Sequence, residues 1–233
     1  MPKYRVAIIG HTGRGNYGHG IDNVWLQFKD RCEIVALADA AEKGRAEAVK
    51  RVQAPKAYAD YRQMLDEMKP QIVAICPRWL DEHRDMVVAA AERGIHIYME
   101  KPFCRSLAEA DQMVAACEKR DVKLAIAHQT RYSPKLQAIR EIIDSGQLGT
   151  VLELRGRGKE DPRGGGEDLW VLGSHVFNMM HHLGGDPQWC SAQICLNGKP
   201  ATKDDVYQAN EGIGLLVGDQ VAAMYGFANG VTG

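Results

Sequence analysis

Residues 5–15 read RVAIIGHTGRG, a short apolar run that leads directly into a turn with three glycines. An apolar run of this length is typical of a strand that is buried on both faces of a parallel sheet. Glycines that follow such a strand mark a tight turn at its carboxyl end. The stretch therefore predicts the first strand and first turn of an α/β domain.

Four further apolar runs follow at intervals that suit strands joined by helices. These runs are Ile34–Ala38, Ile72–Ile75, Ile95–Met99 and Leu124–Ala127. Because right-handed crossovers stack such strands in parallel, we predict a five-stranded Rossmann sheet in residues 1–127.

The sequence between the later runs has the periodicity of amphipathic helices. One apolar stripe comprises Met86, Val87 and Ala90, and a second comprises Leu107, Ala110, Val114 and Cys117. Ser106 and Glu109 have the spacing of a capping box, which predicts that the second helix begins at this point.

After Ala127 the pattern changes, so we predict a second, α+β domain over residues 128–233. Its expected elements are a helix with Leu136, Ile139 and Ile143 on one face, a strand at Val151–Arg155, a flexible loop at Gly164–Gly166, a mostly helical segment over Leu169–Leu183, and a hairpin of Gly212–Val217 with Val221–Phe227. Few other strands are evident, so this open sheet is expected to be truncated.

Composition excludes several classes of protein. With 29 basic and 30 acidic residues the formal net charge is −1, which gives no field that attracts nucleic acid. No apolar run is long enough to cross a bilayer, and the residues after Met1 do not resemble a signal peptide. The six cysteines lack CxxC spacing and are expected to be reduced. We therefore expect a cytoplasmic protein with neither a nucleic-acid nor a membrane partner.

The glycine turn and Asp39 together predict a dinucleotide site. A turn of this kind lets the backbone approach a diphosphate, and the N-terminus of the next helix would donate N–H groups to it. The expected contacts are Gly10, Thr12, Gly13, Arg14 and Gly15, although the spacing G-x-x-G-x-G departs from the usual G-x-G-x-x-G. At the end of the second strand, the Asp39 carboxylate would accept both ribose hydroxyls and repel a 2′-phosphate, which favours NAD over NADP. Alternatively, or in addition, Asp39 caps the helix that starts near Ala40.

The tripeptide Glu100-Lys101-Pro102 follows the fourth predicted strand, at the edge where open α/β sheets bind ligands. Together with the glycine turn, Asp39, Gln129-Thr130-Arg131-Tyr132 and Gly173-Ser174-His175, this tripeptide resembles the Gfo/Idh/MocA family of glucose-fructose oxidoreductases and inositol dehydrogenases. The resemblance spans nearly the whole chain. It implies NAD as cofactor and a carbohydrate or polyol as substrate. It also implies that residues 128–233 form part of a domain that binds substrate and supports oligomerisation, so that the full-length form is a homo-oligomer.

The same resemblance assigns roles to individual residues. Lys101 would lie between nicotinamide and substrate, where its ammonium stabilises a developing alkoxide and relays the proton. Glu100 would orient the nicotinamide side of the pocket, while Gln129 and Arg131 meet the cofactor. Tyr132 and Trp170 would contact the substrate, although a core position is equally open for Trp170. The alternative for Glu100 and Lys101 is a solvated charge pair.

His175 is the second predicted catalytic residue, because a neutral imidazole takes a hydroxyl proton at working pH more readily than a lysine does. The family pattern is Asp-x-Gly-x-His with a further Asp three residues later. Here Val171 and Asn178 replace those carboxylates, which would otherwise raise the basicity of the histidine. Glu167 or Asp168 is a possible substitute, although the stretch from the glycines to His175 is one residue longer than in the family.

No metal site is expected. His175 and His182 share a helical face but are about 10 Å apart by the helical rise, too far for one ion, so His181 and His182 are interpreted as structural.

Three functions remain open at this stage. The first is an NAD-dependent dehydrogenase that oxidises a secondary alcohol of a sugar, polyol or cyclitol. The missing carboxylates favour a second, in which bound NAD oxidises the sugar transiently, so that the net reaction is glycoside cleavage, elimination or epimerisation. The third is a non-catalytic dinucleotide-binding scaffold, for which Lys101 would be dispensable.

Overall fold

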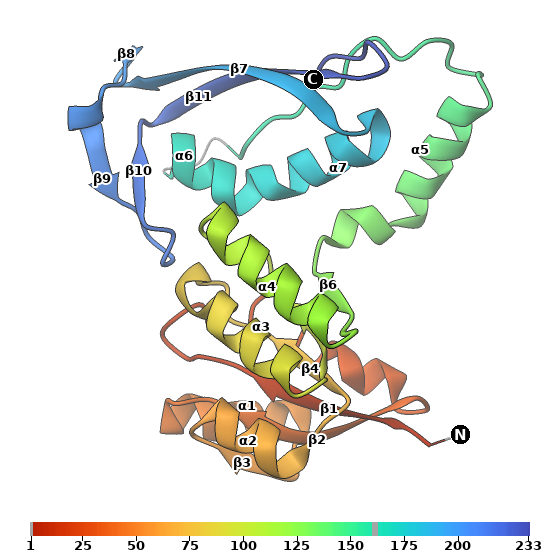
Figure 1. Cartoon of the computed structure of the whole chain (residues 1–233), viewed down its shortest axis with the longest axis vertical. Helices are drawn as coiled ribbons and strands as arrows, with labels where there is room; N and C mark the ends of the chain where they lie inside the picture. The colour runs from red at the N-terminus through yellow and green to blue at the C-terminus, as the bar shows by residue number, and fades with distance from the viewer. Residues whose placement is uncertain (1, 160–162) are drawn as a thin grey trace. The chain divides into compact units, whose positions relative to one another are not determined.

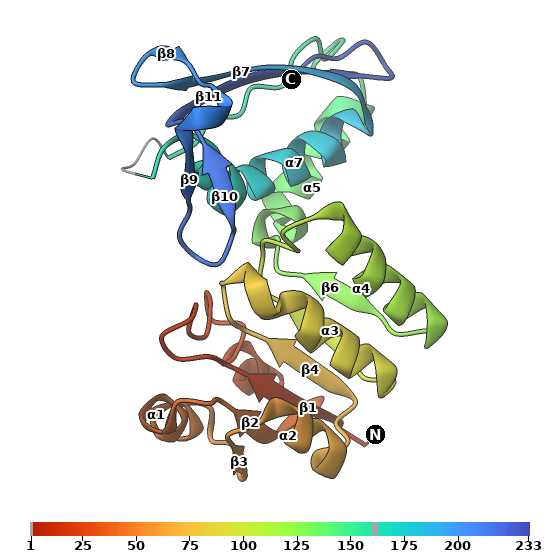
Figure 2. The same cartoon turned by 60° about the vertical axis from the view of Figure 1, so that its left-hand side comes forward.

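The computed structural model describes residues 2–159 and 163–233, which form two compact units. The first unit extends to Ala127 and also includes Glu211–Ile213, and the second comprises the remaining residues from His128 onward. Figures 1 and 2 show the helices and strands of each unit from two directions.

The first unit contains a six-stranded parallel sheet in the order β3-β2-β1-β4-β5-β6. The strands are β1 (Tyr4–Ile9), β2 (Cys32–Ala38), β3 (Ala57–Tyr58), β4 (Ile72–Ile75), β5 (His96–Met99) and β6 (Leu124–Ile126). The Rossmann fold and its five predicted strands are confirmed. The sixth strand, β3, has only two residues and pairs at the edge with Leu37 and Ala38, so it leaves no periodic pattern in the sequence.

Both faces of this sheet are covered. On one face α2 (Tyr61–Met68), α3 (His83–Glu92) and α4 (Leu107–Lys119) contribute Met64, Val87 and Met113 to an apolar core that also contains Ala7 and Ile9. On the other face α1 (Glu42–Val52) and the segment after β1 pack against Ile8 and Leu37. Alternate residues of β1 thus enter opposite cores, which is why the strand reads as an uninterrupted apolar run.

The predicted stripe on α3 is confirmed, because Met86, Val87 and Ala90 are all buried. The stripe on α4 was wrong in part. Leu107 and Val114 are exposed, at 84% and 42%, whereas Cys117 is buried as predicted and Met113, which was not predicted, is buried beside it. Only half of the predicted capping box is present, because Ser106 accepts a hydrogen bond from Glu109 N whereas the Glu109 carboxylate binds Arg105.

The segment after β1 is not an α-helix. Turns occupy residues 11–23, and the only helical piece before β2 is a 3₁₀ segment, η1 (Val24–Phe28). Gly13, Gly15, Asn16, Gly18 and Gly20 all have positive φ, a conformation that no helix contains. The prediction that a following helix N-terminus donates to a diphosphate was therefore wrong.

The second unit has an antiparallel sheet in the order β11-β7-β8 and a separate two-stranded ladder, β10-β9. The sheet strands are β7 (Pro187–Leu196), β8 (Lys199–Pro200) and β11 (Gln220–Phe227), and the ladder strands are β9 (Val206–Gln208) and β10 (Leu215–Val217). The helices of the second unit are η3 (Gln129–Tyr132), α5 (Pro134–Asp144), α6 (Gly165–Asp168), η4 (Leu169–Gly173), α7 (Ser174–Gly184) and the short 3₁₀ segment η5 (Lys203–Asp205). The first unit contains one further 3₁₀ segment among its described residues, η2 (Leu80–Glu82).

Three predictions for this unit were wrong in detail. Val151–Arg155 forms only a single bridge, between Glu153 and Thr232, rather than a strand. The two halves of the predicted hairpin belong to different sheets, because β10 pairs with β9 and β11 pairs with β7. The segment Gly164–Gly166 is not wholly a loop, because α6 already begins at Gly165.

The helix that leads to His175 contains a π-helical turn, η4, between α6 and α7. A π-turn inserts one extra residue into a helix while keeping the flanking turns in register. It therefore accounts for the one-residue excess between the glycines and His175 that the sequence shows.

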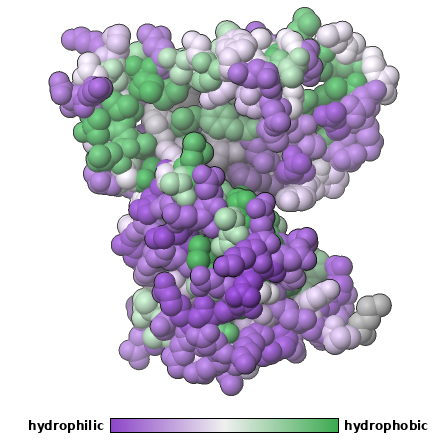
Figure 3. Space-filling view, in the orientation of Figure 1, coloured by the Kyte–Doolittle hydropathy of each residue, from purple (hydrophilic) through white to green (hydrophobic). Residues whose placement is uncertain are grey.

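The two units differ in their surfaces. On the face that Figure 3 shows, the first unit is mostly hydrophilic, whereas hydrophobic side chains gather on the second. The strands of the second unit expose Trp189, Ile194, Val206, Leu215 and Met224. Within the described residues, no helix combines the length and apolarity needed to span a membrane.

Candidate functional site

The carboxyl edge of the parallel sheet gathers most of the predicted cofactor residues. The glycine turn follows β1, Asp39 follows β2, and Glu100-Lys101 follows β5. Because β1 lies beside β4, the strand order reverses between them, and this switch point is where open α/β sheets bind ligands. The first unit thus brings Gly10, Thr12, Gly13, Arg14 and Gly15 to one edge with Asp39, Glu100 and Lys101.

Asp39 lies beneath the glycine turn and is only 1% exposed. Its carboxylate accepts hydrogen bonds from Thr12 N (3.0 Å), Thr12 Oγ1 (2.7 Å), the Tyr17 hydroxyl (2.7 Å) and Ala41 N (2.9 Å). Burial, together with Asp39, raises the pKa of Tyr17 far above its ordinary value, so the hydroxyl remains a donor. Helix α1 begins at Glu42 after the N-cap residue Ala41, so Asp39 is not the N-cap residue. Its contact with a ribose stays a prediction.

Gly44 of α1 allows this arrangement. A Cβ atom at position 44 would overlap the Thr12 side chain, which occupies the space above the helix. A glycine is therefore needed for Thr12 to reach Asp39, and the turn after β1 is fitted closely to the helix after β2.

The glycine turn is also held against the segment that follows β4. Gly15 lies so close to the backbone of Arg78 and Trp79 that a Cβ atom would overlap it, and Arg78 N donates to the Gly15 carbonyl at 3.3 Å. Arg14 stacks on the Trp79 ring, with 4.8 Å from its guanidinium carbon to the ring centroid, and pairs with Asp81.

Two observations show that this turn fits the diphosphate of a dinucleotide. Apart from Gly13 and its two chain neighbours, no atom of the described residues lies within 4 Å of the position that a Gly13 Cβ would occupy, so the turn is open at this point. Among the described residues, Arg14 Nε is buried and has no hydrogen-bond acceptor, a state that a phosphate oxygen would relieve. The amides of Thr12, Gly13 and Arg14 already donate to Asp39, Asn16 and His11. Arg14 Nε is therefore a donor of this turn that remains available to a ligand.

Glu100 and Lys101 are buried, at 1% and 6% exposure, which excludes a solvated charge pair. Glu100 Oε1 accepts from Lys101 N, and Oε2 accepts from His19 N, both at 3.1 Å. Gly18 makes room for this carboxylate, since a Cβ atom there would overlap Oε2. The Lys101–Pro102 peptide bond is cis. Glu100 thus joins residues 10–20, the glycine-rich segment, to residues 100–103, the lysine turn that carries Lys101.

In the second unit, α7 presents two different faces. His175, Asn178 and His182 lie on one side, at spacings of three and four residues. On this side the rings of His128 and His175 meet edge to face, with 5.4 Å between centroids. Arg131 lies 3.0 Å from His182 Nδ1, and the pKa of His182 is lowered by burial and by Arg131 and Arg140. The structure therefore brings the predicted residues Arg131 and His175 to the same face of α7.

The remaining predicted residues differ in exposure. Tyr132 is 70% exposed and Gln129 is also exposed, which leaves both accessible to a ligand. Trp170 is partly buried within the π-turn.

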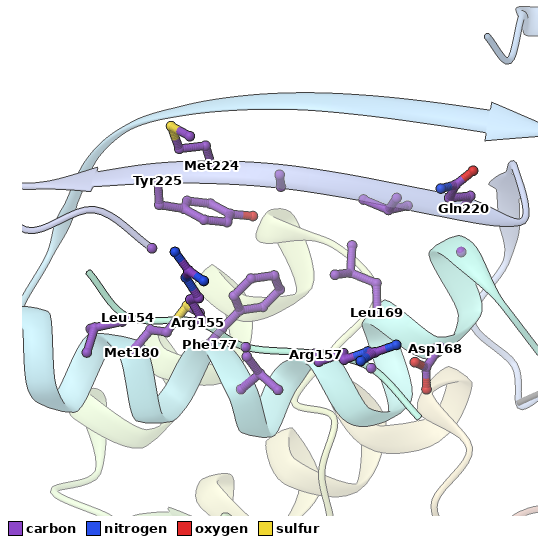
Figure 4. A pocket seen from close by; sticks show the side chains of 18 of the residues that line it. Leu154, Arg155, Arg157, Asp168, Leu169, Phe177, Met180, Gln220, Met224 and Tyr225 are labelled. Carbon is purple, nitrogen blue, oxygen red and sulfur yellow. The ribbon is translucent and has the colours of Figure 1, made fainter. Parts of the chain in front are cut away.

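The opposite face of α7 borders a cavity of about 800 Å³ between this helix and β11. Figure 4 shows Phe177 and Met180 of α7 below Tyr225 of β11, with the Phe177 and Tyr225 rings 5.4 Å apart. Burial, together with Cys190, raises the pKa of Tyr225 to about 12. Because His175 does not line this cavity, we do not assign the predicted chemistry to it.

The two candidate substitute carboxylates are both buried. Glu167 accepts two hydrogen bonds from the Asn210 amide, at 3.2 Å each. Asp168 accepts from Lys159 N and lines the cavity, on the other side of the helix from His175. The position of Asp168 does not favour a role as partner of His175, and the Glu167 carboxylate is already engaged by Asn210. Among the described residues, no three potential metal ligands are grouped.

Sequence reasoning missed Tyr17 and Gly18, which complete the site around Asp39 and Glu100. The continuation of the glycine run to Gly20 was the available signal, because repeated glycines indicate repeated close approaches of the backbone.

Comparison with known proteins adds independent evidence. The model of the Gfo/Idh/MocA oxidoreductase family, described as an NAD-binding Rossmann fold, matches residues 4–128. A myo-inositol 2-dehydrogenase of Thermotoga maritima is 26% identical over 189 residues, covering 78% of this chain and 55% of the relative. A levoglucosan dehydrogenase of Pseudarthrobacter phenanthrenivorans is 27% identical over 222 residues, covering 84% and 56%. The chain thus spans about half the length of these curated relatives.

Solved structures show the same fold. A levoglucosan dehydrogenase in complex with NADH and levoglucosan superimposes with a TM-score of 0.78 at 24% identity, covering 100% of this chain and 66% of that one. An oxidoreductase from Agrobacterium radiobacter in complex with NAD⁺, L-tartaric acid and magnesium gives a TM-score of 0.76 at 22% identity, covering 99% and 65%.

Replacing Tyr17 by Phe tests the cluster around Asp39. The change removes a buried donor to a carboxylate, so we expect the free energy of unfolding to fall by about 1.5–3 kcal/mol. Urea denaturation, monitored by circular dichroism, measures this free energy. Tyr58→Phe is the matched control, because it removes an exposed hydrogen bond to Glu67 and should cost less than about 0.5 kcal/mol. Equal effects of the two substitutions would contradict a structural role for the Asp39 cluster.

Proposed function

Because the chain belongs to the Gfo/Idh/MocA oxidoreductase family, and its first unit is an NAD-binding Rossmann domain, we propose that it oxidises a secondary alcohol of a sugar, polyol or cyclitol. One observation carries this proposal. Lys101 has 6% exposure, and its backbone amide is anchored through the Glu100 carboxylate to the glycine-rich segment at the switch point of the sheet. A buried cation fixed beside a dinucleotide site suits a reaction in which negative charge develops on a substrate oxygen.

Bound NAD would supply the hydride acceptor. The residues of this chain would bind it through Arg14 at the diphosphate, Asp39 near the adenosine ribose, and Gln129 and Arg131 toward the nicotinamide. The Lys101 ammonium would hold the substrate oxygen and stabilise its alkoxide form. His175 would accept the hydroxyl proton. Tyr132 and Trp170 would contact the sugar.

Asn178 supports a second candidate, in which NAD is retained and the net reaction is cleavage, elimination or epimerisation. In the family pattern a carboxylate stands at this position, three residues after the histidine. Here the Asn178 Oδ1 atom is buried and, among the described residues, has no hydrogen-bond partner. An amide does not raise the basicity of a neighbouring imidazole as a carboxylate does. His175 would therefore be a weaker acceptor of the substrate hydroxyl proton than the histidine of the family pattern.

The exposed apolar side chains on the strands of the second unit support the expectation of a homo-oligomer. Light scattering of the purified full-length form tests this expectation, and a mass equal to one chain would contradict it.

Replacing Lys101 by Met tests the catalytic assignment. On mixing the protein with NAD and a panel of sugars, polyols and glycosides, we expect absorbance of NADH to accumulate in proportion to enzyme. The substitution should lower kcat by about 10²-fold or more, because it removes the charge and the proton relay. Lys123→Met, at a highly exposed lysine, is the control.

The outcomes separate the candidate functions. Consumption of a glycoside without accumulation of NADH would favour the retained-cofactor reaction. Full activity of the Lys101→Met protein would contradict a catalytic role for Lys101, and NADH binding without any turnover of the panel would favour a scaffold.

Preference for NAD over NADP follows from the carboxylate at the end of β2. Because a carboxylate repels a 2′-phosphate, we expect NADH to bind at least about tenfold more tightly than NADPH. Fluorescence titration with the two reduced dinucleotides measures the ratio. Equal affinities would show that Asp39 remains engaged with Thr12 and Tyr17 when the dinucleotide is bound.

A further inference from the structure

His83 is a fully buried histidine that the proposed chemistry does not use. It is the first residue of α3, and its ring lies between two loops at the carboxyl edge of the sheet. Nε2 is 2.7 Å from the carbonyl oxygen of Pro77, and Nδ1 is 3.2 Å from the carbonyl oxygen of Phe103. Both ring nitrogens therefore face backbone carbonyls rather than side chains.

The two carbonyls belong to different loops. Pro77 lies just after β4, in the segment that packs against the glycine turn. Phe103 lies after β5, two residues beyond Lys101. The ring thus spans the gap between the β4 loop and the turn that carries Lys101.

Burial lowers the pKa of His83, although the neighbouring carbonyls and Glu100 act in the opposite direction. A neutral imidazole has one N–H group. The shorter contact assigns this hydrogen to Nε2, which donates to Pro77, while the Nδ1 side of the ring abuts the Phe103 carbonyl. The ring therefore donates a hydrogen bond to the β4 loop on one side. On the other side it packs against the turn that carries Lys101 without a hydrogen bond, because Nδ1 and the Phe103 carbonyl oxygen are both acceptors.

The turn that carries Lys101 needs such support. Up to Glu100 the chain is held by the sheet, where Glu100 N donates to the Ile75 carbonyl at 2.8 Å. At Lys101 the chain leaves the sheet, and the Lys101 amide donates to the Glu100 side chain. Two residues after Lys101, the Phe103 carbonyl oxygen lies 3.2 Å from His83 Nδ1 at the start of α3, so Lys101 stands between a contact of Glu100 and a contact of His83.

We propose that His83 is a positioning residue for Lys101: by donating to Pro77 and abutting Phe103, it fixes the turn over residues 100–103 against the β4 loop. The proposal rests on the proposed function only in so far as Lys101 is the catalytic cation. The placement of Lys101 itself is testable without turnover.

The test uses two variants that preserve different halves of the imidazole. In His83→Gln the amide nitrogen can occupy the position of Nε2 and keep the hydrogen bond to Pro77. In His83→Asn the amide nitrogen matches Nδ1 and the donor to Pro77 is lost. Met64→Ala, which opens a cavity elsewhere in the same core, is the control for general destabilisation.

The first measurement is the rate at which acetic anhydride labels Lys101 in the folded protein, determined by mass spectrometry relative to exposed Lys123. Loss of one buried hydrogen bond should raise local opening, and with it labelling of Lys101, by about tenfold in His83→Asn. His83→Gln should stay within about twofold of the wild-type rate because its donor remains. Met64→Ala should leave the ratio unchanged.

The second measurement separates this proposal from the proposed function. If the wild-type protein turns over a sugar or polyol, His83→Asn should lower kcat by about tenfold without changing NADH affinity, and His83→Gln should restore kcat. If no substrate is turned over, the labelling ratio alone decides. Equal labelling of Lys101 in the Gln and Asn variants would overturn the proposal, whatever the activity.

Discussion

The proposed site depends on the hydrogen bonds that the Glu100 carboxylate accepts. It is buried, and its two oxygens accept hydrogen bonds from His19 and Lys101, on two loops that are far apart in the sequence. A buried carboxylate that loses its donors is costly, so the glycine-rich segment and the lysine turn must adopt their positions together. Gly18 is a glycine because the carboxylate occupies the space of a side chain. Asp39 holds the first half of the glycine-rich segment in a similar way, by accepting hydrogen bonds from the hydroxyls of Thr12 and Tyr17.

Much of the fold could be predicted from the sequence, because parallel strands buried on both faces are continuous apolar runs. β1, β2 and β4 are of this kind, and their order along the chain implies right-handed crossovers. The failures share one physical cause, which is that the partner is distant in the sequence. β11 pairs with β7 rather than with β10, and the exposure of Leu107 depends on what α4 packs against. No local pattern contains that information.

The candidate site shows the same division. Glu100 and Lys101 could be placed at the carboxyl edge because they directly follow a strand, and their burial agrees with a site rather than a solvated pair. The partners of Asp39 could not be predicted, since they depend on the path of a glycine-rich segment that is not helical. The π-turn before His175 explains an extra residue that the sequence shows but cannot locate. A single histidine at the start of an apolar helix gives no sign that its ring spans two loops, so His83 was missed.

We infer that Glu100 couples the glycine-rich segment to the lysine turn and so shapes the dinucleotide site. Titration of Glu100→Gln with NADH, followed by fluorescence, measures this coupling directly. The amide presents an N–H group to a backbone N–H that requires an acceptor, so affinity for NADH should fall by about tenfold or more while the far-ultraviolet circular dichroism stays unchanged. An affinity equal to that of the wild-type protein would contradict the account.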